Sequence, residues 1–438
     1  MSSSGPAVVK TENESGHSEG VREWSLPALF AFRFGFCYFL LFIYPSLLGW
    51  RGSQPDQNNL VRQMWDHVVP WVGSNLLHLA GPFTPVVEES GDQLYDYILW
   101  LCIFSTAVIA AIIWSLFDRK RKQYDSLYEW LRVLVRLVLA VVMIDYGTGK
   151  LFRDQFPELS LATLVETYGQ SSPQHLLWAC MQYSRPYSFF GGLGEAVGGI
   201  LLIVPRFVTL GALITLAMVS NVLMLNLSYD VPRKIFCIHL LLMCIFLLWP
   251  DIRRLFGFFV LHRSEQLPAP RPLFQEKAFN RIALFLQLAV GTFILLYCAH
   301  SSYVDSVRHA AQVRPAVRGI WDVDQFNFDG VPRSPLLTDT VRWQRVILDR
   351  PELITIQLMN DTQQQFFVQW NGQRMKGSLW STENHSRVGD LTVDNVQADR
   401  MVLEAQLAGH RVEAELRRLD LSDPTKFLLT NRGFHWIN

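Results

Sequence analysis

Seven apolar segments limit what this chain can fold into more than any other feature of its sequence. Their ranges are 25–48, 93–117, 129–150, 188–204, 207–228, 234–250 and 279–300. Each is long enough, or nearly long enough, to cross the hydrocarbon core of a bilayer, which needs about 20 helical residues. We therefore predict a polytopic α-helical membrane protein with about seven spans, followed by a domain outside the membrane.

The basic residues of two loops predict an orientation. The loop after the second segment contains Arg119-Lys120-Arg121-Lys122, and the loop after the sixth contains Arg253, Arg254, Arg263, Arg271 and Lys277. Loops rich in Lys and Arg stay in the cytoplasm, and seven spans place both loops on one side. We expect a bacterial cytoplasmic (inner) membrane protein with a cytoplasmic N-terminus and an extracytoplasmic C-terminal domain.

The segments between the spans complete the expected organisation. Residues 1–23 are rich in Ser, Gly and Glu and are expected to be a disordered tail. The run 26–48 is too long for a cleaved signal peptide and lacks its cleavage site, so we interpret it as the first span. Two segments, 59–72 and 173–183, are candidates for amphipathic helices at the membrane surface.

These observations predict five parts. They are a tail (1–23), two spans with a long outer loop (24–128), a four-helix bundle (129–255), a linker with the seventh span (256–301) and an extracytoplasmic helix and β-rich domain (302–438).

The third span carries charged residues along its length. Arg136 lies about two turns deep, as does Arg33 in the first span, so each needs a polar partner or a water-filled cavity. Asp145, Tyr146 and Lys150 follow at the opposite end of the span.

The fourth span begins with a glycine-rich stretch that contains one carboxylate. Gly194 and Gly198 form a small-residue packing pattern, and Gly198 and Gly199 share a helical face with Glu195. Close packing therefore brings a neighbouring helix against Glu195. Two interpretations remain open: a structural partner such as Arg, Lys or Asn, or a functional acid or base.

The fifth and sixth spans add polar residues of their own. Asn221 and Asn226 lie in the fifth span, and His239 lies in the sixth. Hydrogen bonding between helices explains the two asparagines. For His239 we expect structural hydrogen bonding rather than metal ligation, and proton handling is the alternative. No His, Cys, Asp and Glu set has metal-ligand spacing, so we predict no metal site.

The shared depth of these residues is the stronger signal. One group of candidate residues maps to the outer half or edge of spans three to six: Asp145, Tyr146, Lys150, Glu195, Asn221, Asn226, Tyr229, Asp230, Lys234 and His239. A helical bundle with a polar mouth is a natural pocket for an amphipathic ligand.

The C-terminal part changes to period-two alternation after a short helix expected at 302–315. Strand candidates are 341–348, 353–359, 364–370, 373–380, 390–395, 400–407, 410–418 and 426–437. Asn371-Gly372, Gly389-Asp390 and Ala408-Gly409 are typical of hairpins. We predict an antiparallel β barrel or sandwich that docks a partner.

Composition excludes some classes of function. The formal net charge is 0, which gives no support to nucleic-acid binding. Five of the six cysteines lie in apolar segments and none forms Cys-x-x-Cys, which disfavours a thiol relay.

Residues 129–255 resemble the DoxX family of bacterial membrane proteins. The likeness rests on Arg136, on Gly147-Thr148-Gly149-Lys150 at the end of that helix and on Glu195 in the glycine-rich helix. The patterns at 146–152, 225–232 and 432–436 are similar to a longer branch with added spans and a β tail. The resemblance implies a four-helix bundle, and some relatives are subunits of a thiosulfate:quinone oxidoreductase.

Together these points lead to two hypotheses. The first is a component of a membrane redox system, a quinone-linked oxidoreductase subunit that binds a quinone or similar lipid-like molecule. Arg136 and Lys150 would contact the ligand, and Glu195, Asp230 or His239 would handle protons. The second is a non-catalytic membrane scaffold or lipid- or solute-binding protein whose domain at 316–438 docks a protein partner.

Overall fold

The computed structural model describes residues 23–48, 60–81, 83, 91–263, 273–311, 315, 317–371, 375–382, 384–423 and 425–431. The tail expected at 1–23 lies outside these residues except for Glu23. The chain forms two compact units. Unit 1 comprises Met1–Val86 and Gln93–Val133, and unit 2 comprises Val87–Asp92 and Leu134–Asn438.

Unit 1 is built on a pair of long helices, α1 (Leu26–Leu48) and α3 (Leu94–Phe117). The amphipathic segment expected at 59–72 is helix α2 (Leu60–Trp71), which continues as a π-helical turn, η1 (Val72–Leu76). The deep Arg33 has the partners that its position required: its guanidinium donates to Ser115 Oγ, to the Asp118 carbonyl and to the Tyr124 hydroxyl.

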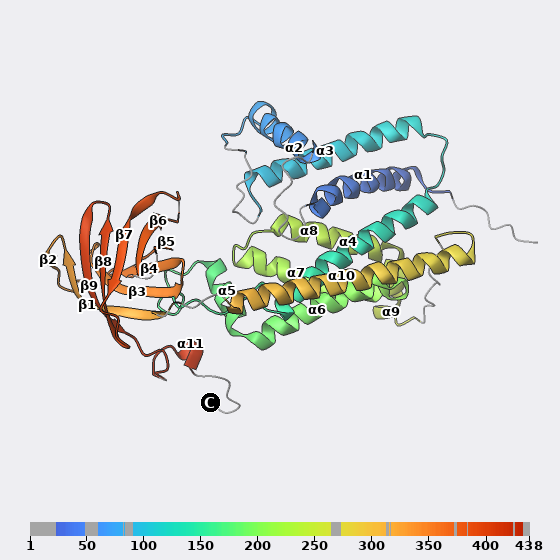
Figure 1. Cartoon of the computed structure of the whole chain (residues 1–438). Coiled ribbons are helices and arrows are strands. Elements are labelled where there is room, and N and C mark those ends of the chain that lie inside the picture. The colour runs from blue at the N-terminus through green and yellow to red at the C-terminus, as the bar shows by residue number, and fades with distance from the viewer. Residues whose placement is uncertain are drawn as a thin grey trace, which may run out of the picture. The chain divides into compact units, whose positions relative to one another are not determined.

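The helices of unit 2 start with the part of α4 (Asp125–Leu151) from Leu134 onward, while the earlier residues of α4 belong to unit 1. Its further helices are α5 (Pro173–Tyr183), α6 (Arg185–Ile203), α7 (Val208–Ser228), α8 (Lys234–Leu248), α9 (Ile252–Phe259) and α10 (Lys277–Ala311). Short 3-10 turns, η2 (Pro205–Phe207) and η3 (Trp249–Asp251), join α6 to α7 and α8 to α9. Helix α10 runs alongside α4 and α6 (Figure 1).

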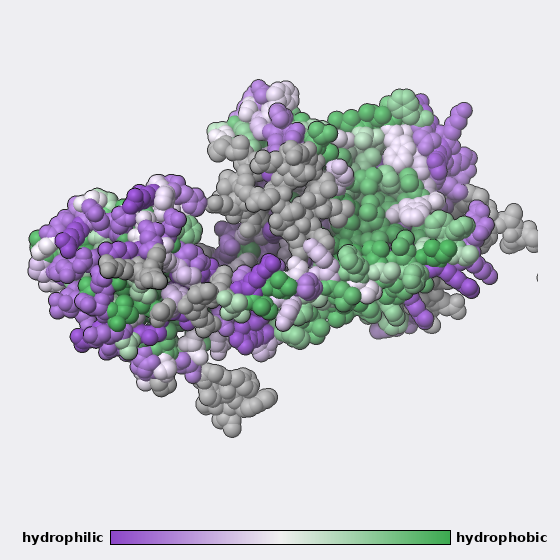
Figure 2. Space-filling model, in the orientation of Figure 1, coloured by the Kyte–Doolittle hydropathy of each residue, from purple (hydrophilic) through white to green (hydrophobic). Residues whose placement is uncertain are grey.

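Within the described residues, six helical segments are long and apolar enough to cross a membrane. They match six of the predicted spans, and Figure 2 shows a predominantly apolar surface over the helices. Helix α4 coincides with the remaining predicted span, but its charged residues make it too polar to count among these six segments. The structure thus confirms the fold class of a helical membrane protein with a C-terminal β domain.

The β domain is a closed antiparallel barrel rather than a sandwich. Its strands are β1 (Gly319–Phe328), β2 (Val331–Pro332), β3 (Trp343–Arg350), β4 (Leu353–Leu358), β5 (Gln363–Trp370), β6 (Lys376–Ser381), β7 (Arg387–Asp394), β8 (Arg400–Leu407) and β9 (His410–Arg418). Each long strand pairs with the next, and β9 pairs with β1, so that eight strands close the barrel in the part of the chain that the structure describes.

Alternating side chains fill the interior of this barrel. Trp321, Phe326, Trp343, Leu403 and Leu416 belong to one continuous apolar core. Eight strands leave an interior just wide enough for side chains, which is how it is used here.

The structure differs from the predictions for this region at four points. The helix expected at 302–315 is the continuous end of α10. Strand β1 was missed, and 426–437 contains helix α11 (Leu428–Asn431), beyond which the chain lies outside the described residues. Gly389-Asp390 lies inside β7 rather than in a hairpin turn. A Cβ on Gly389 would lie 1.7 Å from the Gln406 carbonyl oxygen, so the approach of β8 requires this glycine.

The remaining hairpin predictions fared better. Ala408 and Gly409 join β8 to β9 with φ of 49° and 88°, which is the backbone that a two-residue hairpin turn needs. Asn371 directly follows β5, whose partner strand is β6, while Gly372 lies outside the described residues.

Candidate functional site: a buried lysine–glutamate pair

Glycines bring α4 and α6 into backbone contact. A Cβ on Gly147 would lie 2.6 Å from the Ala196 nitrogen, and one on Gly192 would lie 2.8 Å from the Gly147 carbonyl oxygen. On its other side α6 approaches α7, where a Cβ on Gly198 would lie 2.7 Å from Thr215 Oγ1. Small residues at such crossings allow membrane helices to pack closely.

This close contact joins Lys150 to Glu195. Lys150 Nζ lies 2.6 Å from Glu195 Oε2, and the two side chains are only 8% and 4% exposed. Glu195 therefore has a cationic partner, as one of the two interpretations of the sequence required. The α4 glycine Gly147 and the α6 glycine Gly192 border the pair directly.

Tyr146 extends the pair towards the start of α8. The Lys150 ammonium lies 5.6 Å from the centre of the Tyr146 ring, within range of a cation–π interaction. The Tyr146 hydroxyl accepts a hydrogen bond of 2.9 Å from Arg233, whose backbone is left-handed with φ of 79°. Arg233 was not among the candidate site residues, although its neighbour Lys234 was.

Asp92 fixes the beginning of α8. Its carboxylate accepts hydrogen bonds from the backbone nitrogens of Lys234 at 2.6 Å and Ile235 at 3.1 Å. The Lys234 ammonium lies 3.0 Å from Asp230 and 4.0 Å from Asp92. Asp92 was missed because its partner is distant in sequence. Pro232 precedes this helix by two residues.

Asn226 lies close to α8, as expected of a polar group between helices, whereas the hydrogen bond of His239 stays within its own helix. Asn226 Nδ2 lies 3.4 Å from the Pro232 carbonyl oxygen and 3.5 Å from Cys237 Sγ. His239 is buried, and its Nδ1 donates to the Ile235 carbonyl at 2.7 Å.

The other predicted residues lie around the pair rather than in it. Asp230 is largely exposed, Tyr229 and Asp145 are half-buried, and Asn221 is exposed on the surface of α7. Asn221 therefore does not belong to a pocket shared with Asn226, because the two side chains lie on different faces of α7 and only Asn226 is buried.

Arg136 is bonded to a different helix. It donates to Gln287 of α10 at 2.5 Å, and further along the same contact Ser302 donates to Thr148 at 3.3 Å. Gln287 was missed, and the signal for it is an amide in the middle of the last apolar segment. Arg136 is thus linked to α10, whereas Lys150 is linked to α6.

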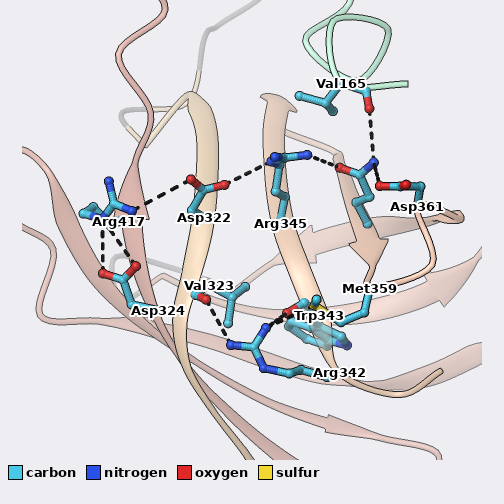
Figure 3. A network of polar contacts seen from close by, with 11 residues as sticks. Val165, Asp322, Val323, Asp324, Arg342, Trp343, Arg345, Met359, Asp361 and Arg417 are labelled. Atoms are coloured by element: carbon cyan, nitrogen blue, oxygen red, sulfur yellow. Dashed lines mark hydrogen bonds and ion pairs between the residues drawn. The ribbon is translucent and has the colours of Figure 1, made fainter. Parts of the chain in front are cut away.

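The segment between α4 and α5 contacts the barrel. Asp322 and Arg345 form an ion pair on the barrel's outward surface, and Arg345 donates to Gln357 (Figure 3). Gln357 donates in turn to the Val165 carbonyl at 3.1 Å, and the Leu161 amide donates to Asp349.

Apolar contacts accompany these polar ones. Leu161 packs on Ile320 and Ile347, which point outward from the barrel and are fully buried. The chain between Lys150 and Glu195 is therefore attached to the barrel wall.

All six cysteines are free, and among the residues described no group of three His, Cys, Asp or Glu side chains gathers to hold a metal ion.

Comparison with known proteins gives one informative match. A stretch of 124 residues is 32% identical to the uncharacterized protein YwoB of Bacillus subtilis (strain 168), covering 79% of that protein and 28% of this chain. No family model matches the chain, and no solved structure matches it.

Proposed function

This chain belongs to the same family as YwoB of Bacillus subtilis. From the residues of its own α4–α8 bundle, we propose that the bundle is DoxX-like and binds a quinone or similar lipid-like molecule. The observation that carries the proposal is the Lys150–Glu195 pair, buried at the end of a bundle of membrane-length helices. Ionisable residues at membrane depth are costly and usually mark a binding or proton-transfer site.

The chemistry of the pair suits a quinone. A lysine ammonium donates to a quinone carbonyl, and a carboxylate accepts from a hydroquinone hydroxyl. Tyr146 supplies an aromatic ring beside the ammonium. Reduction of a quinone consumes electrons and protons together, so we propose that a partner redox subunit supplies the electrons and that Glu195 and Lys150 handle protons.

Asp230 and His239 have different places in this proposal. Asp230 is exposed beside Lys234 and would exchange protons with water at the mouth of the bundle. His239 is buried with its Nδ1 on a carbonyl, which favours a structural role. Arg136 would hold α10 against the bundle through Gln287 rather than contact the ligand.

We further propose that this is a bacterial inner-membrane protein with a cytoplasmic N-terminus and an extracytoplasmic barrel. The basic run 119–122 supports this orientation. Cys180 offers a direct test, because it is exposed on α5, the helix between α4 and α6. A membrane-impermeant maleimide should label Cys180 in intact cells from outside, with Cys180→Ser as the control. Labelling only after cell lysis would contradict the orientation.

Binding is tested on purified protein in nanodiscs. Native menaquinone or ubiquinone should be retained and identified by mass spectrometry, and Lys150→Met or Glu195→Gln should reduce retention at least tenfold. Asn221→Ala is the matched control, since Asn221 is a polar residue of the same bundle that faces outward. Unchanged retention in the folded Lys150 and Glu195 variants would remove the basis of the proposal.

The filled barrel favours a second candidate function, that of a scaffold. Because Trp321, Phe326 and Trp343 fill the interior, a partner has only the outer surface of the barrel to recognise. Deletion of 316–438 should then abolish recovery of a protein partner from native membranes. Intact assembly after the deletion would contradict the docking role.

A further inference from the structure

Helix α9 carries an apolar surface far from the lysine–glutamate pair. Helix α8 begins at Lys234, close to that pair's end of the bundle, and α9 follows the other end of α8 after η3. Pro250 lies within η3 and has no N–H to donate, so the hydrogen bonding of α8 is interrupted there. Helix α9 is therefore a separate element at the opposite end of the bundle.

One face of α9 consists of exposed apolar side chains. Ile252, Phe256 and Phe259 recur at helical spacing, and Phe256 and Phe259 are 56% and 63% exposed. Val260 and Leu261 extend this surface beyond the helix. Exposed large apolar side chains in such a run are unfavourable in water and mark a surface for lipid or for a partner.

The opposite face is basic and anchored to the protein. Arg253 is exposed, and Gly257 on the same side is buried. Asp251 fixes the turn into α9, because it accepts from Thr209 of α7 at 2.7 Å and from Arg254 at 3.0 Å. The orientation of α9 is thus set by its polar side, which leaves the apolar side turned outward.

We infer that α9 is an interfacial helix that binds the anionic phospholipid surface of one leaflet. Phe256 and Phe259 would enter the boundary between headgroups and acyl chains, while Arg253 and Arg263 would contact lipid phosphates.

Two observations favour lipid over a protein partner. The apolar side chains of α9 continue the exposed surface of α8 and η3, where Ile245 and Trp249 respectively are also exposed. Segment Lys234–Phe259 is itself one of the helical stretches apolar enough for a membrane. Arginines are costly in the hydrocarbon core, so Arg253 and Arg254 mark its edge, and the apolar residues after them lie at the interface.

Depth-resolved fluorescence quenching tests the position of α9. The full-length Cys180→Ser protein carrying Phe256→Cys is labelled with bimane in nanodiscs that contain doxyl-labelled lipids. We expect strong quenching by headgroup-proximal doxyl and weaker quenching at the bilayer centre. Gln406→Cys, exposed on the barrel, is the control and should not be quenched. An unquenched label at 256, and at 259 in a second variant, would place α9 in water or against protein and overturn the inference.

Lipid selectivity is tested separately. Phosphatidylglycerol retained by the full-length protein is measured by native mass spectrometry, with phosphatidylcholine as the competitor. Arg253→Gln should lower the preference for phosphatidylglycerol about fivefold, and Arg411→Gln on the barrel should not change it. Equal retention in the wild type and the Arg253 variant would overturn the anionic preference, even if the helix lies in the interface.

Discussion

Replacing Lys150 by Met and Glu195 by Gln, singly and together, tests whether the buried pair is kept for stability or for binding. At 2.6 Å and an effective dielectric constant of about 20, the attraction between the two charges is about 6 kcal/mol. Removing two ions from water costs several kcal/mol for each, so the net contribution of the pair to stability is near zero.

The single and double variants should therefore behave very differently. Lys150→Met leaves a buried carboxylate and Glu195→Gln leaves a buried ammonium, and each should lower the free energy of unfolding by about 3–5 kcal/mol. The double variant leaves neither charge and should lie within about 1 kcal/mol of the wild type, because Met and Gln have similar volumes to the residues they replace.

Equilibrium unfolding by steric trapping in bicelles measures these free energies, and quinone retention is measured on the same samples. A double variant that is stable but retains no quinone would separate the two roles of the pair. If the double variant is as unstable as the worse single variant, the pair is a net stabiliser and the reasoning is wrong.

Three further predictions follow from named contacts. Gly147→Ala should lower the free energy of unfolding by about 1–3 kcal/mol, because it forces α4 away from α6. Gly149→Ala, whose Cβ would meet only Gln155 at 3.7 Å, should be neutral or stabilising. Thermal unfolding compares the two variants, and equal effects would contradict the packing argument. Gln357→Ala should lower the free energy of unfolding by about 1–3 kcal/mol and speed hydrogen exchange at Val165. Unchanged exchange would show that Gln357 does not hold the segment between α4 and α5 on the barrel. Hydrogen bonds from the backbone of Arg342 and Val341 hold the pKa of Asp339 below its usual range. The stability that ionised Asp339 adds to the folded protein is present above its unfolded pKa of about 4, and it is lost as the pH falls through the lower folded pKa. The stability gap between wild type and Asp339→Asn should therefore narrow as the pH falls, and a gap of constant size would contradict this.

Sequence periodicity predicted the helices well because membrane length and glycine spacing are local properties. The face shared by Glu195, Gly198 and Gly199 correctly indicated a close neighbour, but Lys150 was one of several eligible cations. Identifying Lys150 as the partner of Glu195 requires knowing where α4 crosses α6, and Gly147 and Gly192 together determine that crossing.

The errors in the barrel have equally specific causes. Strand β1 was missed because a register shift between Val323 and Gln325 breaks the alternation, so that Phe326 faces the core where strict period two would not place it. Gly389 was assigned to a turn because glycine is typical of turns, whereas the neighbouring strand is what excludes a side chain there. Asp92 carried no local signal at all, since its bonds to Lys234 and Ile235 join distant parts of the chain.

The two proposed functions meet in the segment that joins α4 to α6. Lys150 lies at the end of α4 and Glu195 lies in the middle of α6, and the segment that follows α4 is held on the barrel through Leu161 and Val165. A partner that displaces this segment from the barrel would act on the end of α4 that carries Lys150, and the coupling must be reciprocal if it exists. Gln357→Ala therefore has a second readout: if the barrel only docks a partner, quinone retention stays at the wild-type level while Val165 loses protection. If retention falls as well, with Lys150 and Glu195 unaltered, the barrel contact and the buried pair form one coupled system.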